Sequence, residues 1–194
     1  MTYQPMTGNE LIARLQRGRR DFQGIKLVEG NLEIVPAYTT LKIMTQRNLG
    51  AGYGEGADFS KSDLTGLRAP GIVLRGAVFD DAILRNINLA HADLGYSSFK
   101  NARLAHVDFS RGAVACSMFE GAVLDDVDIA GNLFFEVGLS KSLVRRIRGI
   151  PEAKHVATGG IDDLVVDRET YQQMQDAFPH NFPLIARDST LSII

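Results

Sequence analysis

Residues 57–141 decide the fold, because they divide without a gap into seventeen five-residue units. In order, the units are ADFSK, SDLTG, LRAPG, IVLRG, AVFDD, AILRN, INLAH, ADLGY, SSFKN, ARLAH, VDFSR, GAVAC, SMFEG, AVLDD, VDIAG, NLFFE and VGLSK. The third residue of every unit is apolar, and the first is small in most units. Five residues suffice for one short extended segment and one tight turn, so two side chains of each unit can point inward. No unit buries its apolar atoms alone, and the pattern therefore predicts a stack of repeats.

The apolar third positions also repeat in kind, with a period of twenty residues. Phenylalanine recurs in one unit of every four, and leucine recurs in the unit that follows it. Like side chains stack when they lie above one another, so twenty residues form one coil and four units form its sides. The core ladder predicted in this way consists of Phe59, Phe79, Phe99 and Phe119 beside Leu64, Leu84, Leu104 and Leu124.

The five-residue unit resembles the A(D/N)LXX consensus of the pentapeptide repeat family, and the resemblance covers residues 57–141. It implies an all-β fold, a right-handed quadrilateral β-helix, in agreement with the twenty-residue period. Aspartate or asparagine at the second position is part of that consensus. We expect these side chains to accept hydrogen bonds from turn amides. They are Asp58, Asp63, Asn88, Asp93, Asp108 and Asp128.

The residues before the repeat predict a cap, one earlier coil and an insertion. Thr7 and Glu10 have the spacing of a capping box, which predicts a short helix at about residues 7–17. Phe22, Leu27 and Leu32 are five residues apart, so Phe22 extends the core ladder into a coil at about residues 20–37. The spacing from Phe22 to Phe59 is not a multiple of five, and residues 38–56 are therefore predicted to be a loop insertion.

After Lys141 the five-residue pattern decays, which predicts a C-terminal cap. Asp167 is a candidate N-cap for a second short helix that ends at about Phe178, before Pro179. The predicted organisation is a capping helix at 1–19, a pentapeptide repeat β-helix at 20–144 and a C-terminal cap at 145–194.

Composition limits the compartment and the kinds of partner. The formal net charge is −2, which favours neither direct binding to nucleic acid nor binding to an anionic membrane. No apolar run approaches the ~20 residues that span a bilayer, and no signal-peptide pattern opens the sequence. Cys116 is the single cysteine, which fits a reducing compartment. We expect a cytoplasmic protein, of a bacterial-like type.

The sequence predicts neither an enzyme nor a metal or cofactor site. His91 and His106 occupy outward positions on different sides of the coil, where solvated imidazoles are the ordinary interpretation. Cys116 has no adjacent basic residue to lower the pKa of its thiol. The acidic pairs at 80–81 and 125–126 lie on convex walls, where no cleft would perturb a carboxylate. No recognised motif contains His155, His180, the acidic pair at 162–163 or the glycine pair at 159–160.

Two functions from different classes remain. The first is a scaffold whose flat walls bind a protein partner of unknown identity. The second is suggested by the family resemblance, because some pentapeptide repeat proteins mimic DNA, regulate type II topoisomerases such as DNA gyrase and confer quinolone resistance. Residues 57–141 contain eleven acidic and eight basic residues with mixed signs, whereas a DNA mimic should be more uniformly acidic.

One side of the coil is predicted to become apolar toward its C-terminal end. The candidate interaction patch consists of Tyr96, Ala113, Ala115, Cys116, Leu133 and Phe135. An exposed apolar patch usually marks a contact. Either the C-terminal segment of the chain covers the patch, or a second subunit does. The first alternative would use Tyr171, Met174, Phe178, Leu191 or Ile193. The family resemblance supports the second, because known relatives form homodimers through their C-terminal regions.

Overall fold

The computed structural model describes residues 2–35, 37, 38, 56–177 and 192–194. Most of the insertion predicted at 38–56 therefore lies outside the described residues, as do Phe178 and Leu191.

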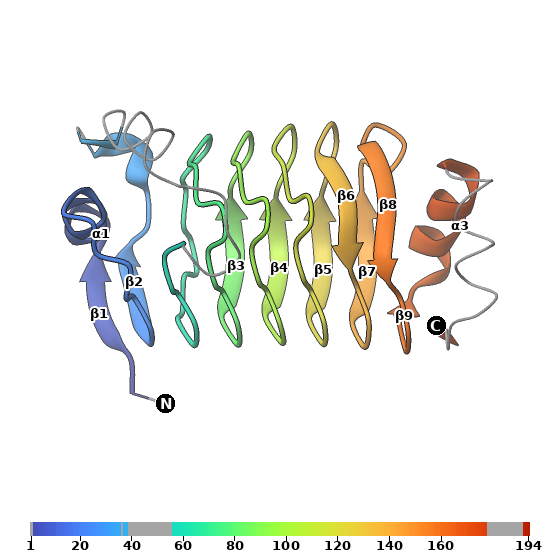
Figure 1. Ribbon diagram of the computed structural model, residues 1–194, viewed down its shortest axis with the longest axis horizontal. Coiled ribbons are helices and arrows are strands. Elements are labelled where there is room, and N and C mark those ends of the chain that lie inside the picture. The colour runs from blue at the N-terminus through green and yellow to red at the C-terminus, as the bar shows by residue number, and fades with distance from the viewer. Residues whose placement is uncertain (1, 36, 39–55, 178–191) are drawn as a thin grey trace.

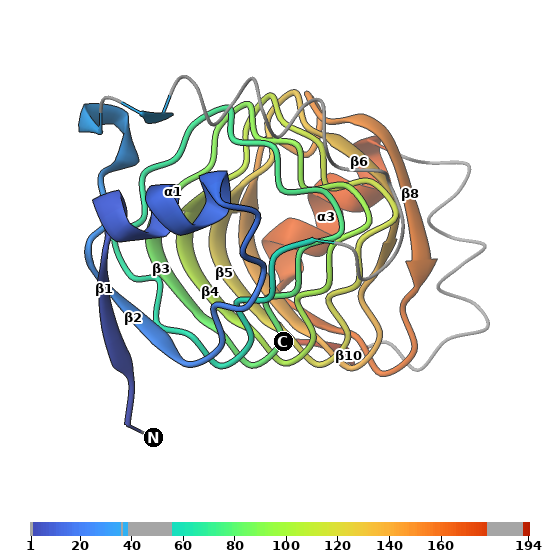
Figure 2. The same ribbon diagram turned by 60° about the vertical axis from the view of Figure 1, so that its left-hand side comes forward.

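The chain forms a parallel β-solenoid of about seven turns, seen from the side in Figure 1 and obliquely along its length in Figure 2. Strands β3 (Ile83–Asn88), β4 (Arg103–Asp108), β5 (Val123–Asp128) and β7 (Leu143–Arg148) stack in parallel register. Leu84 pairs with Leu104, and Leu104 pairs with Leu124. Each coil therefore contains twenty residues and four sides. The predicted four-sided solenoid is confirmed.

We number the four walls by their first unit in the regular repeat. The first wall begins at Ala57, the second at Ser62, the third at Leu67 and the fourth at Ile72. The strands of the second wall turn into the third wall and form the most regular sheet. Its strand order is β10-β9-β7-β5-β4-β3, where β9 is Val165–Val166 and β10 is Ser192–Ile193. On the other walls, most neighbouring coils pair through isolated parallel bridges, such as Val73 with Asp93 and Ser98 with Met118.

The corners depend on the second and fifth residues of each unit. The fifth residue lies in the left-handed region, with φ of 59° at Asp81 and 56° at Asn101. Aspartate, asparagine and glycine adopt this conformation more readily than other residues do, which explains their frequency there. The second-position carboxylate accepts a hydrogen bond from the amide two residues later. For example, the Ser110 amide donates to the Asp108 carboxylate at 2.8 Å. These side chains thus stabilise turns within a coil.

The core is a column of stacked side chains. The Phe99 ring is fully buried, and its centroid lies 4.8 Å from that of Phe79 and 4.6 Å from that of Phe119. Phe109, on the opposite wall, contacts Phe99 edge to face at 6.0 Å. Phe22 and Phe59 extend the stack toward the N-terminus, and the four leucines of the core ladder are buried beside it.

The N-terminal end begins with a strand that the sequence pattern did not indicate. Strand β1 (Gln4–Thr7) pairs in parallel with β2 (Ile25–Glu29). Helix α1 (Gly8–Gln16) follows directly, with Thr7 as N-cap and a complete capping box to Glu10. The apolar face of α1 covers the open end of the core.

The first coil joins the regular repeat across the insertion. It includes a short 3₁₀ helix, η1 (Leu32–Ile34). Asp21 forms a bridge with Asp58, at an offset of 37 residues instead of twenty. The buried Tyr38 hydroxyl donates to the carbonyl of Pro70 at 3.1 Å, so the chain leaves the coil near the corner between the third and fourth walls.

The solenoid continues beyond residue 144, where the predicted repeat domain ended. Strand β6 (Leu133–Gly138) pairs with β8 (Lys154–Gly160), and β7 pairs with β9 (Val165–Val166). Leu143 is opposite Val165, an offset of 22 residues, so the last coil is longer and its five-residue register is lost. The apolar inward positions remain, and Ile150, Ile161, Leu164 and Val166 are all buried. The strands of the solenoid therefore extend past the boundary predicted at residue 144.

Helix α3 (Arg168–Ala177) and strand β10 (Ser192–Ile193) close the C-terminal end. Strand β10 pairs with β9, and the buried Met174 of α3 covers the last coil. The predicted helix beginning after Asp167 is present.

Candidate interaction surfaces

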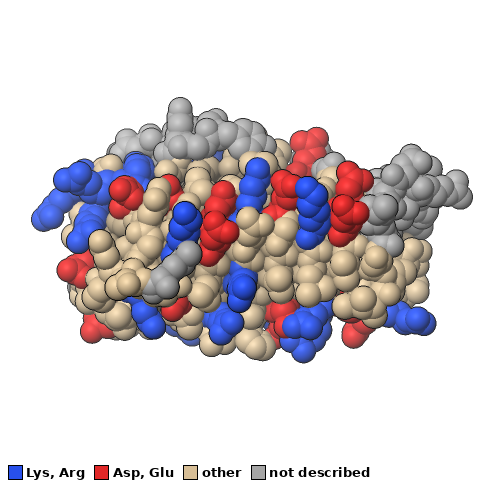
Figure 3. Space-filling view, turned by 90° about the horizontal axis from the view of Figure 1, so that it is seen from below, with Lys and Arg blue, Asp and Glu red and all other residues tan. Residues whose placement is uncertain are grey.

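The walls combine acidic and basic side chains at short range. Figure 3 shows both signs interleaved along one face of the solenoid. On the first wall, Glu120 lies 3.2 Å from Lys141 and 4.0 Å from Lys100. Asp80 accepts hydrogen bonds from the Ser98 hydroxyl and the Lys100 amide of the next coil, and so links the two coils. Charges that neutralise one another in this way do not reproduce a ladder of phosphates.

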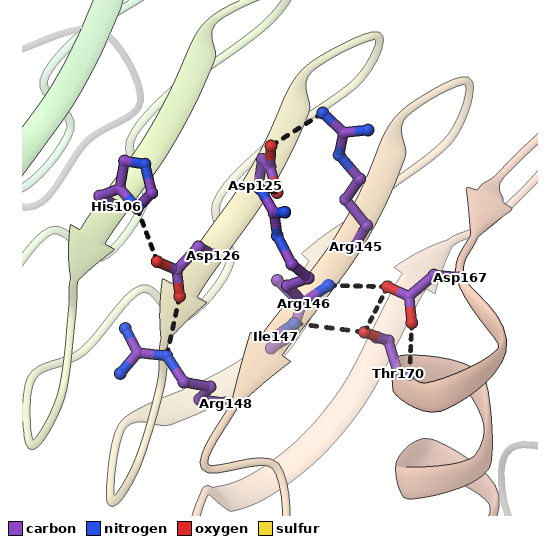
Figure 4. A network of polar contacts seen from close by, with 9 residues as sticks. All are labelled: His106, Asp125, Asp126, Arg145, Arg146, Ile147, Arg148, Asp167 and Thr170. Carbon is purple, nitrogen blue, oxygen red and sulfur yellow. Dashed lines mark hydrogen bonds and ion pairs between the residues drawn. The ribbon is translucent and has the colours of Figure 1, made fainter.

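An ion-pair network covers the C-terminal half of the second wall (Figure 4). The Asp125 carboxylate lies 2.8 Å from Arg145 and 2.5 Å from Arg146. Asp126 lies 2.6 Å from His106 and 2.9 Å from Arg148. The hydrogen bond with His106 lowers the pKa of Asp126. Two of these pairs, His106 with Asp126 and Asp125 with Arg145, join residues twenty apart in the sequence, and that spacing is the signal by which they could have been predicted.

The same network ends at the cap of the last coil. In Figure 4, Asp167 and Thr170 lie beside the backbone of β7. The amide of Arg146 donates to Asp167 at 2.7 Å, and the amide of Ile147 donates to the Thr170 hydroxyl at 3.2 Å. Burial raises the pKa of the Asp167 carboxyl, but hydrogen bonds from Thr170 and Arg146 outweigh it and lower the pKa. Side chains at the N-terminus of α3 thus accept hydrogen bonds from backbone amides of β7, which a further coil would otherwise accept.

The candidate interaction patch lies on the fourth wall. Each side chain described there is half-buried: Tyr96, Ala113, Ala115, Cys116 and Leu133. Phe135 belongs to strand β6, and its side chain lies outside the described residues. The alanines make the middle of this wall flat, because they project only a methyl group. The patch is therefore smooth and only partly exposed.

Polar side chains hold the N-terminal side of the patch in place. The Arg75 guanidinium lies 5.3 Å from the ring centre of Tyr96 and 3.3 Å from the Asp93 carboxylate. This geometry is a cation–π contact that fixes the aromatic ring. The sequence pattern did not predict these contacts, because they depend on side-chain direction across coils.

Cys116 lies on the same wall, 3.7 Å from the Glu136 carboxylate. Burial raises the pKa of the thiol, and the negative charge of Glu136 raises it further. A raised pKa disfavours the thiolate, which is the reactive form.

The described C-terminal residues do not cover the patch. Met174 lines a small apolar cavity of about 20 Å³ at the end of the core, together with Phe134 and Ile150. Ile193 extends the sheet at β9. Tyr171 packs beside the same core. Phe178 and Leu191, the other residues of the predicted cover, lie outside the described residues, so this alternative stays a prediction. The open end of a solenoid exposes more apolar surface than its wall, so the cap covers the end.

Metal-ligating side chains do not cluster in the described ranges. Residues 2–35, 37, 38, 56–177 and 192–194 contain no group of three His, Cys, Asp or Glu side chains that could hold a metal ion. In that part of the chain, no helix combines the length and the apolar character needed to cross a membrane.

The family model of pentapeptide repeats matches residues 57–94 and 82–112, with eight copies of the repeat. Residues 57–112 of this chain are therefore pentapeptide repeats. No curated protein sequence matches it.

Solved structures of pentapeptide repeat proteins share the fold. HetL, which is involved in heterocyst differentiation regulation in the cyanobacterium Nostoc, aligns at 17% identity with a TM-score of 0.55. The match covers 84% of this chain and 66% of HetL, slightly less than two thirds of that protein.

Two further structures are less similar. A pentapeptide repeat protein of the Arabidopsis thaliana thylakoid lumen aligns at 13% identity and a TM-score of 0.46, over 67% of this chain and 82% of that one. The plasmid-mediated fluoroquinolone resistance protein QnrB1 aligns at 13% identity and a TM-score of 0.22, over 65% of this chain and 85% of that one. Similarity this low supports no inference about function.

Proposed function

We propose that this pentapeptide repeat protein is a non-enzymatic interaction module that binds a protein partner through its fourth wall, in the cytoplasm. The observation that supports the proposal is the fixed Tyr96 ring, held by Arg75 beside the flat surface of Ala113 and Ala115. Tyrosine and arginine are enriched among the residues that dominate binding energy in protein interfaces. A ring that is already ordered loses little conformational entropy when a partner binds.

The alternative function is regulation of a type II topoisomerase by DNA mimicry. The ion pairs of the first and second walls count against it, because carboxylates neutralised by neighbouring cations present little net negative potential.

The test is affinity capture from a lysate of the source organism, with quantitative mass spectrometry. The informative variant is Ala115→Arg, which places a charge in the centre of the fourth wall. The matched control is Ala105→Arg, since Ala105 is also half-buried and also fourth in its unit, but lies on the opposite wall. We expect a specific partner to be retained by the control and reduced at least about tenfold by Ala115→Arg. Equal capture by both variants would show that the fourth wall is not the binding surface.

A gyrase supercoiling assay examines the alternative. We expect no inhibition at about micromolar protein, and strong inhibition there would favour the DNA-mimic function.

A further inference from the structure

The two ends of the solenoid differ in charge. The N-terminal cap, residues 1–20, contains four arginines and one acidic residue, and the first coil beside it adds Asp21, Glu29 and Glu33 with Lys26. The C-terminal cap, residues 161–177, contains five acidic residues and one arginine. The whole chain has a formal net charge of only −2, so this polarity is hidden in the overall composition. Helix α1 lies at one end of the long axis and α3 at the other (Figure 1).

The charged side chains lie on the outer faces of the two cap helices and beside them. Arg14, Arg17 and Arg19 are exposed at the N-terminal end, where Figure 3 shows basic side chains gathered. Within the described part of the chain, none of these arginines forms an ion pair, in contrast to Arg145, Arg146 and Arg148 on the second wall. At the C-terminal end, the exposed acids include Asp162, Glu169 and Asp176.

Exposed apolar side chains mark the same two ends. Among the described residues, the exposed large hydrophobic side chains are Val28 and Ile34 in the first coil, and Ile193 and Ile194 at the C-terminus. Ile193 is opposite Val166, so it continues an inward-facing column past the last full coil. Apolar groups placed beside unpaired charges are typical of a contact surface.

The N-terminal end also contains a hollow that could receive such a side chain. Its volume is about 270 Å³, and it lies between the start of α1 and the first coil. Ile34 and Val35 form its apolar lining, and Glu29 and Asn31 are among its polar residues.

We propose that the basic N-terminal end of one copy binds the acidic C-terminal end of a second copy, so that the molecules associate head to tail. Opposite charges attract across this contact, and Ile193 and Ile194 meet the apolar side of the hollow. A contact between two C-terminal ends would instead place like charges opposite each other, which is unfavourable. The contact is heterologous, so an open assembly of any length keeps one unbound N-terminal end and one unbound C-terminal end.

This inference goes beyond the proposed function, because it uses the ends of the solenoid and leaves the fourth wall free. A failure of the fourth-wall capture experiment therefore does not bear on it.

Charge-reversal variants of the full chain test the proposal by sedimentation velocity. The N-terminal variant is Arg17→Glu with Arg19→Glu. The C-terminal variant is Asp162→Lys with Asp176→Lys, whose second change places a cation near a helix C-terminus, where it is tolerated. The control is Lys61→Glu with Arg111→Glu, which changes the same number of charges at exposed wall positions without an ion pair to any described residue. Circular dichroism verifies that each variant is folded.

The native chain should associate with rising concentration at about 0.05 M salt and dissociate at about 0.5 M, where charges are strongly screened. Each end variant alone should lower the association constant at least about tenfold, and the control should not. A mixture of the two end variants should associate again, since each supplies the end that the other has lost.

Several results would overturn the proposal. One is a chain that stays monomeric at low salt at every concentration. Another is association that persists in both end variants. If only the C-terminal variant dissociates, the contact joins two C-terminal ends and the head-to-tail arrangement is wrong.

Discussion

Replacing Phe99 by alanine perturbs the centre of the core ladder. Phe99 has no exposed surface, and it stacks between Phe79 and Phe119 while also contacting Phe109 edge to face. Truncation of a buried phenylalanine costs about 3–5 kcal/mol. That range already includes lost aromatic pairs, which are worth roughly 0.5–1.5 kcal/mol each, and the loss of three such pairs puts Phe99 at its upper end. We therefore expect a loss of about 5 kcal/mol in the free energy of unfolding.

Urea unfolding followed by circular dichroism measures this loss, and an unchanged m-value shows that cooperativity is kept. The control is Arg103→Ala, an exposed position that forms no ion pair with the described residues, and it should change stability by less than about 0.5 kcal/mol. His106 would be a poorer control, because it contacts Asp126 and has a positive φ. A loss below about 1.5 kcal/mol for Phe99→Ala would refute the stacked-core account.

Three further changes test the caps, corners and walls. Asp167→Ala should cost about 1–2 kcal/mol at neutral pH, since it removes an N-cap and a partner of the Arg146 amide. The folded-state pKa of Asp167 is lowered, so its contribution is present above the unfolded pKa of about 3.9 and is lost as the pH falls through the folded value. Thermal melts from pH 7 to acid should show the native chain and the variant converging, and a constant difference would contradict this. Gly56→Ala should destabilise strongly, because its Cβ would lie 2.4 Å from the Ala77 nitrogen, whereas Gly66→Asn should cost less than about 1 kcal/mol, because that position is open and left-handed. Equal expression and melting of these two variants would argue against the close approach of Gly56 to the next coil. A double-mutant cycle on Asp125 and Arg145 should give a coupling of about 0.2–1 kcal/mol that decreases with salt; a larger, salt-independent coupling would mean that the pair is more buried than described.

The regular part of the fold follows from the sequence because each prediction uses a repeated position. Twenty-residue spacing of Phe59, Phe79 and Phe99 is enough to fix the number of sides, since no other coil length would stack like residues. The capping box of α1 was predictable for a similar reason, because Thr7 and Glu10 interact locally.

The irregular ends follow from longer-range geometry. Strand β1 is four residues long and gains its partner only after α1 has turned the chain back. The last coil stretches to an offset of 22 residues, so a search for five-residue units stops too early. The contact of Arg75 with Tyr96 depends on rotamers that no sequence pattern specifies.

Disulfide formation between residues twenty apart tests the central claim, that one coil contains twenty residues, most directly. In a Cys116→Ser background, Arg85→Cys and Ala105→Cys would occupy paired positions on β3 and β4. Neighbouring strands lie about 4.8 Å apart, within the range of separations that a disulfide spans. Under mild oxidation, mass spectrometry should detect an intramolecular disulfide for this pair and none when Arg85→Cys is combined instead with Lys100→Cys or Ser110→Cys. Efficient crosslinking of either of those pairs, with none between positions 85 and 105, would contradict the four-sided solenoid.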